Sequence, residues 1–161
     1  MVVLLLGACA GVRADKAEGL VLNEVLAVNE ASNSDEAEQF DDWLEIHNGG
    51  AVAVSLADLY LSDDAAAPGR WPLPADETLA PGAFLLVWCD GELEQGPLHA
   101  PFKLSGGGET VVLSYVRDDD TTLLDQVEFG EQLADTAWAR LPDGGIEWAA
   151  AAPTPGASNA E

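Results

Sequence analysis

The sequence predicts an all-β fold, either a β-sandwich or a β-barrel, and three observations lead to that prediction. From residue 19 onward, short apolar runs alternate with turn-forming Gly, Pro, Asn and Asp at regular spacing. In the clearest run, residues 42–48, apolar and polar side chains alternate with the period of a strand. The hydrophobic fraction of 48% over 161 residues gives the chain enough apolar surface for one core, which argues against disorder.

The expected strands follow one another along the chain. They are residues 20–29, 42–48, 51–56, 59–64, 70–74, 83–91, 109–116, 121–129, 136–141 and 146–151. The segment RDDDTT lies between the seventh and eighth of these runs, which predicts a hairpin. Residues 34–46 have the propensity of a helix, but their acidic first half favours a loop that leads into a strand.

The segment DDWLEIHNGG (41–50) illustrates the strand pattern. The alternation directs Leu44 and Ile46 toward the core. It directs three other side chains to the outer face: Trp43, Glu45 and His47. The Asn-Gly-Gly that follows supplies the backbone freedom of a tight turn. We therefore expect a half-buried strand here and not an active site.

The charge balance is strongly acidic, with 6 Lys and Arg against 29 Asp and Glu, for a net charge of −23. Phosphate backbones are repelled by such a field, and the basic patch that nonspecific nucleic-acid binding needs is missing. Nucleic acid is therefore not expected as a partner. An acidic surface keeps a protein soluble and attracts cations.

The first residues, MVVLLLGACAG, resemble a bacterial lipoprotein signal. They are apolar and too short to span a bilayer, and Leu6-Gly7-Ala8-Cys9 matches the lipobox pattern of a Leu and two small residues before a Cys. The resemblance implies a signal peptide over residues 1–8, a lipidated Cys9 and a tether over residues 9–18. The alternative is a buried first strand with an incidental Cys. Cys89 ends an apolar run, so we expect it to act as a small hydrophobic residue.

Several blocks, in order, resemble the lamin-tail domain, and in particular its bacterial branch. They are LVLNEVLAVN, DDWLEIHNGG, VSLADLYLSDD, RWPLP, LAPGAFLLVW, LHAPFKLSGGGETVVLSY and PTPGASN. The resemblance covers residues 19–158 and leaves 159–161 as a tail. It implies an immunoglobulin-like β-sandwich with a role in adhesion, tethering or interaction. It transfers no catalytic residue, and the DNA binding of the nuclear lamins is not carried over, because the basic surface is missing.

Acidic residues at strand ends and loops suggest a calcium site. The candidate ligands are Asp41, Asp42, Glu45, Asp63 and Asp64. If these ends meet at one edge of the sandwich, several oxygen atoms could converge on Ca²⁺. The simpler interpretation, which we favour, is a solvated acidic surface without any cofactor.

A hydrolase is the enzymatic alternative. His47 and His99 are the only histidines, and the candidate nucleophiles are Ser55, Ser62, Ser105 and Ser114. The sequence has no G-x-S-x-G elbow and no histidines at zinc-site spacing. We therefore expect both histidines to be surface or packing residues, and the protein not to be an enzyme.

The five tryptophans are either core residues or binding residues. Trp88, within an apolar run, is the best core candidate. Trp71, beside Arg70 and two prolines, is the one we expect to be exposed, where it would be a candidate contact for a glycan or peptide.

Together these observations predict a non-catalytic lipoprotein domain of the bacterial cell envelope, on the outer membrane or cell surface. Cys9 would attach it to a membrane, and it would bind a protein or glycan partner by adhesion or tethering. The alternatives are a calcium-binding structural module and an accessory domain of a secreted hydrolase system.

Overall fold

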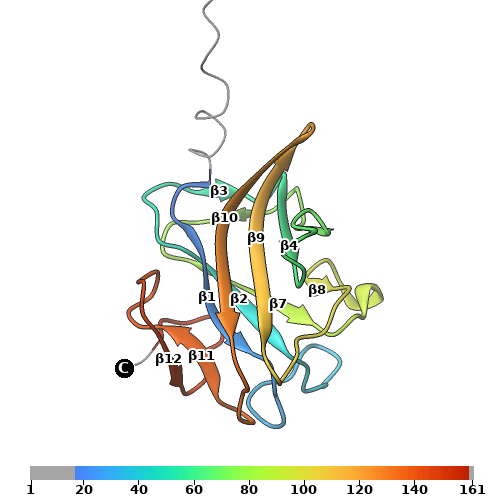
Figure 1. The fold of residues 1–161 in the computed structure, drawn as a ribbon, viewed down its shortest axis with the longest axis vertical. Helices are drawn as coiled ribbons and strands as arrows, with labels where there is room; N and C mark the ends of the chain where they lie inside the picture. The colour runs from blue at the N-terminus through green and yellow to red at the C-terminus, as the bar shows by residue number, and fades with distance from the viewer. Residues whose placement is uncertain (1–16, 160–161) are drawn as a thin grey trace, which may run out of the picture.

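The computed structural model describes residues 17–159, and these residues form a β-sandwich with one short 3-10 helix (Figure 1). The elements in chain order are β1 (Leu20–Leu26), β2 (Trp43–Asn48), β3 (Val54–Ser55), β4 (Leu59–Ser62), β5 (Trp71–Pro72), β6 (Thr78–Leu79), β7 (Phe84–Cys89), η2 (Leu93–Gln95), β8 (His99–Ala100), β9 (Glu109–Arg117), β10 (Asp120–Phe129), β11 (Ala137–Arg140) and β12 (Trp148–Ala151). The predicted all-β, immunoglobulin-like sandwich is confirmed.

Two main sheets form the layers of the sandwich. The six-stranded sheet has the order β12-β11-β1-β2-β7-β8, and the four-stranded sheet has the order β10-β9-β4-β5. Neighbouring strands are antiparallel, except that β8 pairs with β7 in parallel. The long β9–β10 hairpin lies in front of β1 and β2 in Figure 1. A small third sheet joins β3 and β6.

The main core lies between these two sheets. Leu22 of β1 and Leu44 and Ile46 of β2 belong to it and are fully buried, as is Leu113 of the opposite sheet. Burying such a side chain stabilises the fold by about 1.5–3 kcal/mol. The predicted inward direction of Leu44 and Ile46 is therefore confirmed.

The outer face of β2 is covered, contrary to the expectation that it faces water. All six residues of β2 are buried, and Trp43 forms a second apolar cluster with Leu26 and Trp88. The Trp43 indole Nε1 donates a hydrogen bond of 2.7 Å to Oδ1 of Asn33 in the loop before β2. That loop occupies the acidic segment in which we preferred a loop to a helix, and this preference is confirmed.

An ion pair ties the two sheets together where β1 and β10 each carry a bulge. Asp125 of β10 accepts two hydrogen bonds from Nη2 of Arg140, at 2.9 and 2.8 Å, and a third from the backbone N–H of Leu22. Arg140 Nε also donates to the Leu22 carbonyl. The pair satisfies polar backbone groups that the bulge in β1 would otherwise leave unpaired.

The predicted β9–β10 hairpin is confirmed, and its turn contains Asp118 at a φ of 54°. Other strands are shorter than expected; of residues 51–56, only Val54–Ser55 form a strand. Among the described residues, no helix is long and apolar enough to cross a membrane.

Candidate functional site

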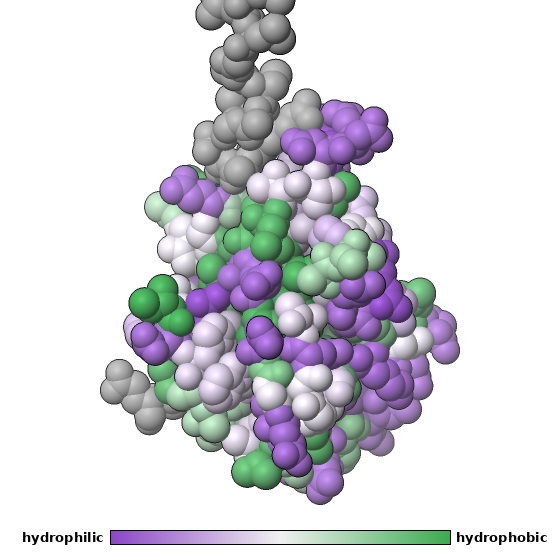
Figure 2. Space-filling model, in the orientation of Figure 1, coloured by the Kyte–Doolittle hydropathy of each residue, from purple (hydrophilic) through white to green (hydrophobic). Residues whose placement is uncertain are grey.

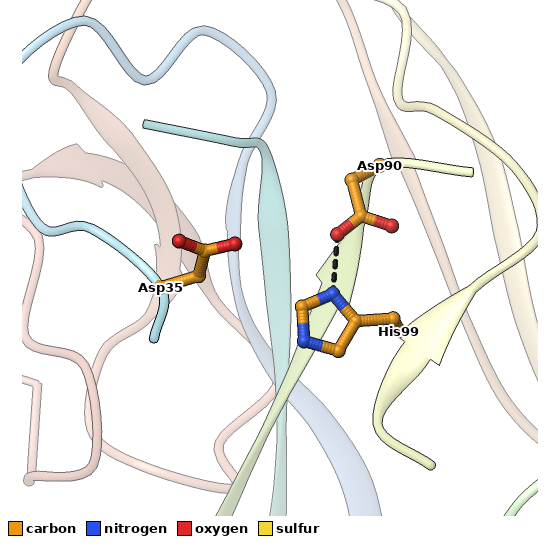
Figure 3. A group of neighbouring side chains, drawn as sticks. All are labelled: Asp35, Asp90 and His99. Carbon is orange, nitrogen blue, oxygen red and sulfur yellow. Dashed lines mark hydrogen bonds and ion pairs between the residues drawn. The ribbon is translucent and has the colours of Figure 1, made fainter. Parts of the chain in front are cut away.

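Three buried side chains that can bind a metal ion meet where the loop before β2 approaches β7 and β8 (Figure 3). Asp35 comes from that loop, Asp90 directly follows β7, and His99 begins β8. Their exposed fractions are 7%, 1% and 1%. The candidate ligand atoms all lie within 4.8 Å of one another. No spacing rule links these residues, so sequence reasoning missed Asp35 and Asp90 and treated His99 as a packing residue.

The His99 ring lies between two carboxylates. Its Nδ1 is in short contact with Oδ2 of Asp90, and its Nε2 is 3.2 Å from Oε1 of Glu36. The ring stacks on Trp88, its partner across the parallel β7–β8 pair. Burial lowers the pKa of His99, but the hydrogen bonds to Asp90 and Glu36 together outweigh burial and hold the pKa above its ordinary value.

Asp35 has one satisfied and one unsatisfied carboxylate oxygen. Its Oδ1 accepts hydrogen bonds from the backbone N–H groups of Ala37 (2.9 Å) and Gln39 (2.8 Å), which hold the turn of the loop. Its Oδ2 is buried and has no hydrogen-bond partner. In Figure 3 the Asp35 carboxylate lies to the left of the His99 ring, and the Asp90 carboxylate lies above it. The cluster thus contains an open acceptor position.

Two of the predicted calcium ligands, Asp41 and Asp42, lie near this cluster. Burial raises the pKa of the Asp41 carboxyl, and the negative charge of Asp90 raises it further. Burial also raises the pKa of Asp42, whose Oδ1 accepts a hydrogen bond of 3.4 Å from the backbone of Asn29. These two residues add negative charge around the cluster.

Glu45, a third predicted ligand, belongs to a different cluster. It lies opposite Glu24 across the β1–β2 pair, and both residues are fully buried. The segment after β12 covers them: the Thr154 N–H donates to Glu24 Oε1 at 2.9 Å, and the Gly156 N–H donates to Glu45 Oε2 at 2.6 Å. Burial raises the pKa of each carboxyl to about 7 despite these hydrogen bonds.

Counting hydrogen atoms favours the neutral, protonated form of Glu24. Asn159 Nδ2 donates to the carbonyls of Asn23 (3.2 Å) and Arg140 (2.8 Å), so both of its hydrogens are used. Asn159 Oδ1 must therefore accept the hydrogen of the Thr154 hydroxyl, at 2.9 Å. A hydroxyl has only one hydrogen, so a proton on Glu24 lets both contacts of Thr154 Oγ1, to Asn159 Oδ1 and to Glu24 Oε2 at 3.0 Å, be hydrogen bonds.

The last two predicted calcium ligands are used within their own turn. Asp63 forms an ion pair with Arg70. Asp64 Oδ1 accepts a hydrogen bond of 2.8 Å from the backbone of Ala66. The structure therefore places the five predicted ligands in three separate locations and does not bring them together.

The predicted exposure of Trp71 is wrong. Its side chain is 8% exposed and belongs to the main core, because β5 pairs with β4 and places Trp71 opposite Leu61. The polar neighbour Arg70 points away from the core and forms an ion pair with Asp63. Trp88 is 7% exposed, which confirms it as a core residue.

Cys89 is buried with a free thiol, as expected, and burial raises its pKa well above the ordinary value. Cys9 lies outside the described residues.

Both candidate histidines and two of the four candidate serines, Ser62 and Ser114, are engaged in the fold. His47 lies on the outer side of β2, but it is 8% exposed and stacks on Phe84 at a centroid distance of 4.5 Å. The hydroxyl of Ser62 donates to the Asp64 carbonyl, and the hydroxyl of Ser114 donates to the Pro68 carbonyl. Between residues 17 and 159, neither histidine forms a hydrogen bond with a Ser or Cys side chain.

Two hollows open near the start of β1. The first has a volume of about 460 Å³, and Val52, Asp58, Leu59, Tyr115 and Arg117 are among its lining residues. The second has a volume of about 480 Å³ and lies between residues 17–21 and residues 122–124. Figure 2 shows hydrophobic side chains gathered in the upper middle of the face and hydrophilic ones over much of the rest.

Comparison with known proteins gives one match. The family model described as the Lamin Tail Domain matches residues 13–131. No curated protein and no solved structure matches the chain. Strands β11 and β12 lie beyond the matched residues, yet they extend the same six-stranded sheet.

Proposed function

Because the chain belongs to the lamin tail domain family, we propose that it is a non-catalytic binding module of the bacterial cell envelope. The family fold is an immunoglobulin-like sandwich that is generally not enzymatic. In this proposal, a lipid on Cys9 holds the domain at a membrane, and the sandwich binds an envelope protein. A domain that is attached to the membrane and bound to the envelope protein at the same time would act in adhesion or tethering.

One observation carries the non-catalytic part of the proposal: both histidines, the candidate bases of a hydrolase, are engaged in the fold, and so are the buried serines. His47 is stacked, His99 faces two carboxylates, and the buried serine hydroxyls donate to backbone carbonyls. Nucleophilic catalysis needs a hydroxyl or thiol within hydrogen-bond reach of a base. We expect no hydrolysis of esters, phosphates or nucleic acid by the purified full chain. Activity that disappears in His47→Gln would overturn this part.

The partner is proposed to be a protein, and the binding surface the hollow of about 460 Å³ beside β9. Sugars are usually held against an exposed aromatic face. The aromatic residue of this hollow, Tyr115, is only 6% exposed, and Trp71 is buried in the core. Val52, which is 63% exposed, instead offers aliphatic surface, with Asp58 and Arg117 as charged groups beside it. Such a mixture suits a short peptide segment.

A cross-linking pulldown from the native envelope with the full chain tests this surface. Val52 is 63% exposed at the hollow, so Val52→Glu should reduce recovery of the partner at least tenfold. The matched control is Ile146→Glu, because Ile146 is 87% exposed and does not line the hollow. Equal recovery by the two variants, or recovery only of glycans, refutes the proposed surface.

The lipid anchor has its own test, namely mass spectrometry of the mature protein from a bacterial membrane fraction. A mature chain that begins at Cys9 and carries acyl groups is expected. Several acyl chains would give firm attachment, whereas a single one holds weakly. An unmodified chain that retains residues before Cys9 contradicts the anchor and leaves the binding surface to be judged separately.

A further inference from the structure

We propose that Asp35, Asp90 and His99 bind one divalent ion of the first transition row, such as Zn²⁺, where the loop before β2 meets β7 and β8. The site lies apart from the proposed binding hollow, with which it shares no lining residue. The proposal rests on the positions of hydrogen-bond donors and acceptors in the cluster.

The acceptors outnumber the hydrogens that the cluster can provide. A neutral imidazole carries one N–H, yet each ring nitrogen of His99 faces a carboxylate, from Asp90 and from Glu36. A second proton on the ring would satisfy both of these carboxylates. Neither N–H would reach Asp35, whose Oδ2 has no partner. A second proton on His99 would therefore still leave Asp35 Oδ2 without a hydrogen-bond donor.

The unpartnered Asp35 oxygen is an independent sign of a ligand. Asp35 is 7% exposed, and its carboxylate faces into the cluster (Figure 3). A buried polar atom without a partner carries a desolvation penalty, and the penalty is larger for a charged group. Such groups in proteins are normally paired with a cation or coordinated to a metal. A cation placed between Asp35 and Asp90 would remove this penalty at Asp35.

A metal ion on Nδ1 of His99 accounts for every contact. The ion would replace the ring proton that faces Asp90 and would reach Asp35 at the same time. The Nε2–H group would then donate to Oε1 of Glu36, 3.2 Å away. A metal-bound histidine usually donates its other N–H to a carboxylate in this way, which fixes the tautomer and the ring orientation. The stacked Trp88 ring also restricts the imidazole.

The donor set selects the class of metal. Imidazole suits Zn²⁺ and other first-row ions, whereas Ca²⁺ and Mg²⁺ prefer oxygen ligands alone. One nitrogen and two carboxylate oxygens therefore favour a transition metal over calcium. The site includes none of the five residues that the sequence suggested for calcium, although Asp41 and Asp42 add negative charge nearby.

Calorimetric titration of the chelator-treated full chain with Zn²⁺ and with Ca²⁺ tests the proposal. Every protein carries Cys9→Ala, because a free thiol binds zinc. We expect one Zn²⁺ per chain and weaker binding of Ca²⁺. Asp35→Asn and His99→Gln should each lower the Zn²⁺ affinity at least tenfold. Asp76→Asn, which removes an exposed carboxylate elsewhere, should leave the affinity unchanged.

Nitrogen-15 NMR of histidine-labelled protein keeps the test valid if a variant fails to fold. The chain has two histidines, so His47 serves as the internal control. Zn²⁺ should shift Nδ1 of His99 strongly and leave His47 unchanged. The proposal is overturned if Zn²⁺ does not bind, if both variants retain full affinity, or if His99 keeps protons on both nitrogens in saturating Zn²⁺.

Discussion

Replacing Glu24 with Gln should flatten the dependence of stability on pH. In the folded protein Glu24 accepts a hydrogen bond from the Thr154 N–H, and its other oxygen lies 3.0 Å from the Thr154 hydroxyl, to which we infer that the protonated carboxyl donates. A Gln amide reproduces this pattern, because its oxygen accepts and its NH₂ group donates. Gln cannot ionise, so the substitution removes the titration and keeps the contacts.

The sign of the effect follows from the raised pKa of about 7, against 4.5 for an ordinary Glu. Below pH 4.5, the folded and the unfolded chain both hold the proton, and the stabilisation is fully present. As the pH rises from 4.5 to 7, the unfolded chain releases its proton while folded Glu24 keeps it, so the free energy of unfolding falls. Above about pH 7 the folded chain also ionises, and the loss levels off.

The magnitude follows from the same two pKa values. One pKa unit corresponds to about 1.36 kcal/mol, so the full shift of Glu24 is worth about 3 kcal/mol, of which about 2.5 kcal/mol falls between pH 5 and pH 8. Glu45 contributes in the same direction, because burial also raises its pKa to about 7. Wild type should therefore lose more stability than Glu24→Gln over this interval.

Urea unfolding followed by tryptophan fluorescence at pH 5, 6, 7 and 8 measures this difference. Glu24→Gln should lose about 2.5 kcal/mol less than wild type between pH 5 and pH 8, and should be the more stable protein at pH 8. Glu128→Gln is the matched control, because Glu128 is exposed on β10. If Glu24→Gln loses stability as steeply as wild type, the neutral Glu24 inferred from the hydrogen-bond network is wrong.

Three further predictions concern the core and the ion pair between the sheets. Trp71→Ala should lower the free energy of unfolding by about 3–5 kcal/mol in chemical denaturation, because it leaves a cavity in the core; a change below 1 kcal/mol would mean that Trp71 is exposed after all. Arg140→Lys should lower it by about 2–3 kcal/mol, since lysine cannot reproduce the two-pronged contact with Asp125; an unchanged midpoint would contradict that role. In a Cys9→Ala background, Cys89 should react with a thiol reagent only as fast as the protein unfolds, and rapid labelling of folded protein would contradict its burial.

Local patterns in the sequence predicted which way the β2 side chains point, but not what covers them. Alternation placed Leu44 and Ile46 on one side and Trp43 on the other, and both clusters exist. The groups that cover the outer side come from distant segments, such as the Gly156 N–H on Glu45. A period of two carries no information about such partners. The outer face of β2 was therefore predicted to be exposed to solvent, although it is buried.

The candidate metal cluster was invisible to sequence reasoning for the same physical reason. Asp35 reaches it through a loop, Asp90 by following β7, and His99 through the parallel pairing of β8. The acidic motifs that attracted attention instead, including Asp63 and Asp64, are satisfied within their own turn. A run of acidic residues in the sequence more often lies on the solvated surface than at a metal site, because the fold decides which acidic side chains come together.

The two buried acidic clusters involve two segments outside the main strands. The segment after β12 is held on the sheet through Glu24 and Glu45, and Asp35 holds the turn of the loop before β2. In a chain with a net charge of −23, a buried carboxylate meets repulsion from its surroundings as well as desolvation. At Glu24 a proton removes the charge. At Asp35 one carboxylate oxygen, Oδ2, has no hydrogen-bond donor, and the proposed cation would give it a partner. In our interpretation, the same composition produces a neutral hydrogen-bonded network at one place and a cation site at the other, depending on whether a hydroxyl or an imidazole lies beside the acid.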